Sequence, residues 1–246
     1  MTLSQYLEIK NLGKLSLIES YIQIYSIYFN QDPVDVEKLS MKKIKKEVGN
    51  ISNTLKNLES NDNYKESITT KMGELHFKSL TEMSLGEYID LEYFLKDDKI
   101  VETLCLIYRK KNIKFWDIDT WEDWGDFIDK RRDIFLEHNI TEIFGAIKNI
   151  INQKNKFIEK YKDLWNKDDY DYDEELKNEN LTDEEKKIIE EERKIDQVRT
   201  SFNFEFLIHS MTGGDIMRVE EVLKMNVDLL FKFLLVGKQY DLVNKK

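Results

Sequence analysis

The side chains best suited to chemistry lie in one tryptophan-rich stretch. Residues 115–136, FWDIDTWEDWGDFIDKRRDIFL, place Trp116, Trp121 and Trp124 close together among carboxylates. Three neighbouring indoles could stack on a sugar or a base, and together with the acidic side chains they could line an enzyme pocket. The carboxylates would repel a nucleic-acid backbone, however, and tryptophans that pack between helices are the commoner case. We therefore expect this stretch to serve core or interface packing.

The remaining reactive side chains form no catalytic pattern. His76, His138 and His209 are scattered without metal-ligand spacing, and Cys105 has the pattern of a buried helix residue. The sequence contains no serine nucleophile elbow, phosphate loop or dinucleotide fingerprint. It therefore predicts that the protein is not an enzyme and has no catalytic residue, cofactor or metal ligand.

Net charge, cysteine content and hydrophobicity limit the classes of partner and the cellular location that we expect. The chain of 246 residues has a formal net charge of -10, which argues against a surface that holds nucleic acid by neutralising phosphates. A single cysteine allows no intramolecular disulfide, and no secretory signal or membrane-spanning apolar run is seen. We expect a soluble protein, made in the cytoplasm, with neither nucleic acid nor a membrane among its partners.

The elements that must position these side chains are mainly helices. One proline and nine glycines leave few turns, and apolar residues recur at helical spacing over long stretches such as 41–59 and 138–165. The lysines at the start of 41–59 fit a solvated face. Around Met72, Gly73 and Glu74 the residues alternate instead, which predicts one small β-hairpin as the only pair of strands. The predicted fold class is mainly α.

The opening of the chain is repeated in its middle. MTLSQYLEIK, residues 1–10, aligns without a gap with MSLGEYIDLE, residues 83–92. Both copies carry a capping box, formed by Thr2 and Gln5 in the first and by Ser84 and Glu87 in the second. The apolar matches continue downstream.

This match predicts that residues 1–35 and 83–117 form similar helical units. Repeated units bury their apolar faces against neighbours. The duplication therefore favours an assembly or interaction protein, and a homo-oligomer is one arrangement compatible with it.

An acidic stretch separates the C-terminal part of the chain. Carboxylates crowd residues 168–175 without the spacing of an EF-hand, so the stretch reads as a solvated and mobile linker. The expected segments are a first helical repeat unit (1–60), a hairpin connector (61–82), a second repeat unit with long helices (83–165), the acidic linker (166–181) and a C-terminal helical region (182–246).

The last helix is apolar on nearly every side. In NVDLLFKFLLVG, residues 226–237, only Asp228 and Lys232 are polar between the capping asparagine and the glycine, so the helix must be buried. Both the protein's own core and the groove of a partner could bury it, and the segment is too short to span a membrane. The candidate partner-binding residues are Leu229, Leu230, Phe233, Leu234, Trp121 and Trp124.

The order of these features resembles a tail-gene protein of tailed bacteriophages. The resemblance is carried by TLSQYLEI, a lysine-rich helix, a hairpin leading into EMSLGEYIDLEYFLKD, then RRDIFLEHNITEIFGAIKNII and finally GGDIMRVEEVLKMNVDLLFKFLLVGK. The elements GDI and VLKM with a final apolar helix are similar to those of small helical tail assembly chaperones, which are encoded beside the tape-measure gene.

The resemblance implies a role in assembly rather than in catalysis. A chaperone of this family would bind apolar tape-measure helices and keep them soluble in the host cytoplasm while tail-tube subunits are recruited. Its partners would be other phage tail or virion proteins. The alternative within the same setting is a structural neck or tail component that is retained in the virion.

Overall fold

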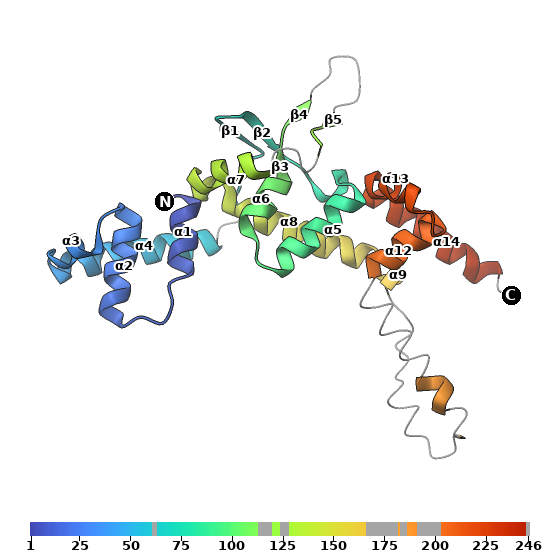
Figure 1. Cartoon of the computed structure of the whole chain (residues 1–246), viewed down its shortest axis with the longest axis horizontal. Helices are drawn as coiled ribbons and strands as arrows, with labels where there is room; N and C mark the ends of the chain where they lie inside the picture. The colour runs from blue at the N-terminus through green and yellow to red at the C-terminus, as the bar shows by residue number, and fades with distance from the viewer. Residues whose placement is uncertain are drawn as a thin grey trace. The chain divides into compact units, whose positions relative to one another are not determined.

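The chain folds mainly into α-helices, which confirms the predicted fold class. The computed structural model describes residues 1–60, 63–112, 120–123, 128–165, 182, 186–190 and 203–244 (Figure 1). The chain divides into two compact units: unit 1 comprises Met1–Ser79 and Tyr93–Gln153, and unit 2 comprises Leu80–Glu92 and Lys154–Lys246. Each unit thus combines distant stretches of sequence. The expected linker, 166–181, lies outside the described residues.

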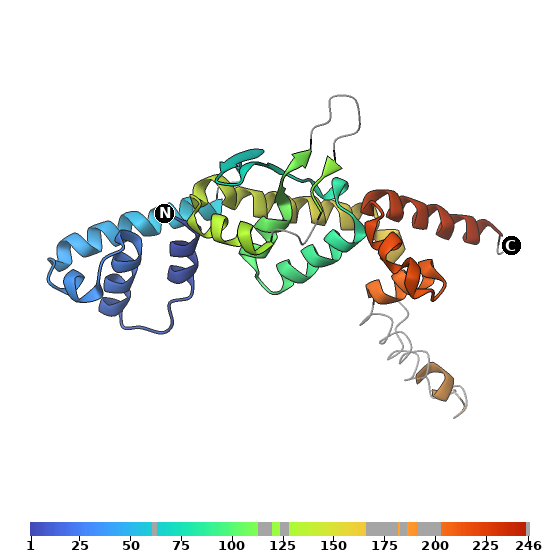
Figure 2. The same ribbon diagram turned by 45° about the horizontal axis from the view of Figure 1, so that its top comes forward.

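Unit 1 begins with four helices. They are α1 (Leu3–Lys10), α2 (Leu17–Phe29), α3 (Pro33–Glu37) and α4 (Met41–Ser60). Figures 1 and 2 show α2, α3 and α4 side by side in blue and cyan. Apolar residues at helical spacing face one another there, and the buried cluster contains Ile22, Tyr25, Val36, Ile44 and Val48. The lysines at 42–46 are exposed on the opposite face of α4, as expected.

The predicted hairpin is present. Strands β1 (Ser67–Thr70) and β2 (Gly73–Phe77) pair antiparallel with Thr70 opposite Gly73, which leaves a two-residue turn. A short third strand, β3 (Tyr108–Arg109), pairs antiparallel with β2. A separate two-stranded pair joins β4 (Lys111–Asn112) and β5 (Thr120–Trp121). The sequence did not predict β3, β4 or β5, because strands of two residues show no alternation.

The predicted repeat holds in its first part only. Helix α5 (Leu85–Lys96) begins like α1, and helix α6 (Ile100–Ile107) follows it as α2 follows α1. The chain then becomes strand β3 at Tyr108, whereas the matching position of the first copy, Ser26, is still helical. Tyr108 leaves the helical pattern because its backbone pairs with Phe77 and its hydroxyl donates to Lys65 O at 2.5 Å. Residues 113–117 lie outside the described residues.

The long helix expected over 138–165 is present with one interruption. Helix α7 (Ile128–Glu137) precedes α8 (Ile140–Lys160), and α9 (Lys162–Trp165) follows after Tyr161. Unit 2 further contains the 3-10 helices η1 (Leu80–Glu82) and η2 (Ile216–Arg218) and the helices α12 (Asn203–Thr212), α13 (Val219–Lys224) and α14 (Val227–Asn244). None of the helices in the described ranges has both the length and the apolar character needed to cross a bilayer.

Aromatic rings form the centre of unit 2. Tyr88 of α5, Phe157 of α8 and Phe231 of α14 are all buried, with ring centroids 5.1–6.0 Å apart. Tyr161 adds contacts to Phe157 at 4.8 Å and to Phe231 at 5.6 Å. Such aromatic pairs stabilise a core beyond the area that they bury. They determine which face of α14 points inward.

Candidate partner-binding site

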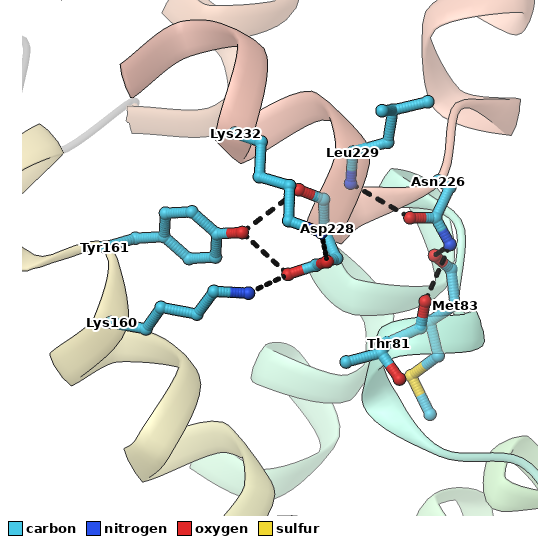
Figure 3. Close-up of polar contacts among 8 residues, drawn as sticks. All are labelled: Thr81, Met83, Lys160, Tyr161, Asn226, Asp228, Leu229 and Lys232. Atoms are coloured by element: carbon cyan, nitrogen blue, oxygen red, sulfur yellow. Dashed lines mark hydrogen bonds and ion pairs between the residues drawn. The ribbon is translucent and has the colours of Figure 1, made fainter. Parts of the chain in front are cut away.

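Helix α14 starts at a tightly bonded corner. The side-chain oxygen of Asn226 accepts a hydrogen bond from Leu229 N at 3.0 Å and so caps the helix. Its side-chain nitrogen donates to Thr81 O at 2.8 Å and to Met83 O at 3.4 Å (Figure 3). The backbone adds a bond from Val227 N to Met83 O at 3.0 Å. These contacts hold the start of α14 against the segment that leads into α5.

Asp228 anchors the first turn of α14 from the other side. Its carboxylate accepts hydrogen bonds from Lys160 Nζ at 2.7 Å, Lys232 Nζ at 2.6 Å and the Tyr161 hydroxyl at 2.6 Å (Figure 3). Burial alone would raise the pKa of Asp228, but these three donors outweigh it and hold the pKa well below its usual range. A negative charge also suits the N-terminus of a helix. The carboxylate is thus a fixed structural acceptor rather than a free acid or base.

The inward face of α14 belongs to the core of unit 2. Val227, Leu230 and Phe231 are buried, whereas Leu234 and Leu235 are half-buried. The sequence left open whether this helix is buried by its own core or by a partner. In the structure its own core covers this one face. The prediction that the whole helix is buried is therefore wrong, because one core can cover only one side of a straight helix.

The outward face of α14 carries four large apolar side chains. Leu229 is 67 % exposed, Phe233 74 %, Val236 63 % and Tyr240 69 %. Their spacing of four, three and four residues aligns them along one side of the helix. We call these four residues the α14 stripe. A contiguous exposed apolar surface of this kind is typical of a protein-interaction site.

The structure describes five of the six predicted partner-binding residues and places them in different surroundings. Leu229 and Phe233 belong to the α14 stripe, Leu230 lies in the core and Leu234 lies between the two faces. Leu230 is therefore not part of the surface, because the corner turns it inward. The sequence reasoning missed Val236 and Tyr240, which could have been found by continuing the four-three-four spacing from Leu229.

Trp121 has partners of its own within unit 1. Trp121 lies in β5 of unit 1 and is half-buried, whereas the stripe belongs to unit 2. The ammonium groups of Lys78 and Lys111 lie 5.5 and 5.7 Å from the centre of its ring, so its ring already makes cation–π contacts within unit 1. Trp124 lies outside the described residues.

The corner that starts α14 has a second version in unit 1. In the first corner the chain start meets the α7–α8 junction, and in the second corner residues 83–88 meet the α13–α14 junction. Each corner is closed by two backbone hydrogen bonds. In the first corner they run from Leu3 N to His138 O and from Ile140 N to Met1 O. The matching bonds of the second corner run from Leu85 N to Met225 O and from Val227 N to Met83 O. The capping boxes predicted for both copies are also present.

Side chains repeat in the two corners as well. The Tyr6 and Phe144 rings meet edge-on with centroids 5.5 Å apart, and the Tyr88 and Phe231 rings do so at 6.0 Å. The junction sequences RRDIFLEHNITEIF (131–144) and RVEEVLKMNVDLLF (218–231) align without a gap and share Arg, Leu, Asn and Phe at matching positions. The duplication thus covers both partners of the corner. The sequence reasoning found only one of them, and this second alignment was the signal for the other.

The possible metal ligands and Cys105 are the remaining reactive side chains in the described part of the chain. No group of three or more His, Cys, Asp or Glu side chains is placed there to hold a metal ion. Cys105 is buried in α6, and burial raises the pKa of its thiol to about 12, so the thiol stays protonated at neutral pH. Comparison of the chain with protein-family models, curated proteins and solved structures gives no match.

Proposed function

We propose that this protein is a non-enzymatic assembly factor of a tailed bacteriophage that binds an apolar helix of a tail protein through the α14 stripe. The phage setting follows from the sequence resemblance, which implies tape-measure helices as the partner and the host cytoplasm as the place of action. The observation that carries the proposal is the exposure of four large apolar side chains along one helix face.

The duplicated corner supplies an internal comparison for this face. In α8 the positions that match the stripe are Glu142, Ala146, Asn149 and Gln153, which are polar or small. Residues 64 and 65 lie against this face of α8, since Lys65 N donates to Glu142 O at 3.2 Å and Tyr64 hydrogen-bonds Asn149. The corner therefore does not require large apolar residues at these positions. Their presence on α14 favours a binding role.

The spacing of the stripe suits a helical partner. Side chains separated by alternating steps of four and three residues pack as knobs into the holes of a facing helix. Burying this surface is favourable by roughly 25 cal/mol per Å² of apolar area, so a long apolar helix would gain solubility by binding here. The net charge of -10 on this chain would favour the solubility of such a complex.

Capture of tape-measure helices by purified protein tests the proposal. The unaltered chain should retain peptides that represent apolar tape-measure helices, and Phe233→Lys and Val236→Lys should each abolish retention. Met217→Lys is the matched control, because Met217 is 82 % exposed in unit 2 but lies in η2 and not on the stripe. Equal retention by all four proteins would refute binding through α14.

Mass spectrometry of purified phage particles then separates the two roles. A chaperone should be absent from the mature particle. Presence of the chain in a fixed ratio to tail subunits would show instead that it is a structural component.

A further inference from the structure

The spacing of the α14 stripe is the same in both directions along the helix. Its spacing of four, three and four residues is symmetric about a point between Phe233 and Val236. A two-fold axis through that point would bring two copies of the helix together antiparallel. Each Phe233 would then face Val236 of the second copy, and each Leu229 would face Tyr240.

We propose that the chain forms a homodimer by antiparallel pairing of its α14 stripes. The inference uses the surface on which the proposed function also rests, and a second copy of the chain is its occupant. A two-fold interface needs a self-complementary patch, in which residue i contacts j and j contacts i. The symmetric stripe meets this requirement.

The sizes of the side chains favour the antiparallel direction. Every layer of an antiparallel pair combines one aromatic residue with one smaller aliphatic residue, so the layers are filled evenly. In a parallel pair, Phe233 would meet Phe233 and the next layer would hold only two valines. Facing positions in well-packed cores alternate large and small side chains.

The flanks of the stripe allow two helices to approach. On one flank Gly237 is exposed and nothing lies within 4 Å of the position that a Cβ would occupy. On the other flank Lys232 would lie beside Gln239 of the second copy. Lys232 already pairs with Asp228 of its own helix at 2.6 Å, so the pairing creates no unpaired charge.

The available area indicates a dimer that forms and separates readily. Two aromatic and two aliphatic side chains, each about two-thirds to three-quarters exposed, present roughly 500–600 Å² on one copy. Two copies would bury about 1,100 Å², which is just below the range of about 1,200–2,000 Å² for stable interfaces. A second copy would therefore shield the stripe without occupying it permanently.

Sedimentation velocity over a wide range of concentrations tests the homodimer. The sedimentation coefficient of the full chain should rise with concentration from that of a monomer to that of a dimer. Phe233→Lys should stay monomeric, and Met217→Lys should dimerise as the unaltered chain does. A monomer at every concentration, or dimerisation by Phe233→Lys, would overturn the proposal.

Disulfide trapping tests the direction of the pairing. A Phe233→Cys chain is mixed with a differently tagged Val236→Cys chain and oxidised; Cys105 is buried and present in both. The antiparallel dimer should give the mixed disulfide, whereas predominant disulfides between identical chains would refute it. Failure of the dimer is distinct from failure of the proposed function, because a strictly monomeric chain that still captures tape-measure helices would refute the homodimer alone.

Discussion

The two phenylalanines near the start of α14 provide a matched test of the orientation of this helix. Phe231 is 1 % exposed and its ring lies 5.1 Å from Phe157, 5.6 Å from Tyr161 and 6.0 Å from Tyr88. Phe233 is 74 % exposed two residues later. Replacing each by alanine removes the same atoms from the same helix, so the difference in intrinsic helix propensity between phenylalanine and alanine cancels in the comparison.

We expect Phe231→Ala to lower the free energy of unfolding by about 3–5 kcal/mol, because it leaves a cavity among three aromatic rings. Phe233→Ala should change it by no more than about 0.5 kcal/mol, as is usual for surface positions. Urea unfolding followed by far-UV circular dichroism measures both, at a protein concentration low enough to keep α14 unpaired. Equal losses in the two variants would refute the assignment of an inner and an outer face to α14.

Three further predictions concern the corners. Asp228→Asn should lower stability by about 1–2 kcal/mol at neutral pH, since its lysine partners are about half exposed. Because folding lowers the pKa of Asp228, its carboxylate stabilises the folded state fully above the unfolded pKa of about 4, and this stabilisation is lost as the pH falls further. The urea midpoints of Asp228→Asn and of the unaltered chain should therefore converge in acid. Thr2→Ala and Ser84→Ala should each cost about 1 kcal/mol in urea unfolding, and a loss from only one of them would contradict the equivalence of the two corners. Gly86→Ala should raise the melting temperature slightly, because alanine has a helix propensity about 0.5 kcal/mol or more better than glycine and its Cβ would lie at an ordinary 3.4 Å from Leu223 O. A lower melting temperature would contradict this expectation.

Local chemistry made the helix starts and the hairpin predictable. A capping box requires only two residues three positions apart, so Thr2 with Gln5 and Ser84 with Glu87 could be recognised without any tertiary information. The hairpin followed from alternation around a glycine, and Gly73 adopts the positive φ of 99°. Strand β3 could not be predicted, because Tyr108 and Arg109 become a strand only through pairing with β2, a distant segment.

The duplication was only half visible in the sequence. The match of residues 1–10 with 83–92 could be recognised because both copies carry a capping box beside their identical Met, Leu and Tyr. The match of 131–144 with 218–231 keeps four identical residues but is spaced differently along the chain. Each corner joins segments more than 130 residues apart, so their pairing is a property of the fold. The bonds from Asn226 to Thr81 and Met83 became apparent only there.

The structure continues the predicted helix to Asn244 and leaves one of its faces exposed. The sequence by itself determined only that residues 227–236 form an apolar helix. It could not determine which side is buried, because apolar residues occur on nearly every side and no periodicity distinguishes one face. The tertiary structure decided this through Tyr88, Phe157 and Tyr161, which come from distant parts of the chain and occupy the space beside Phe231. The same packing turns Leu230 inward and leaves Leu229 and Phe233 exposed, since a rigid helix cannot bury both faces against one core.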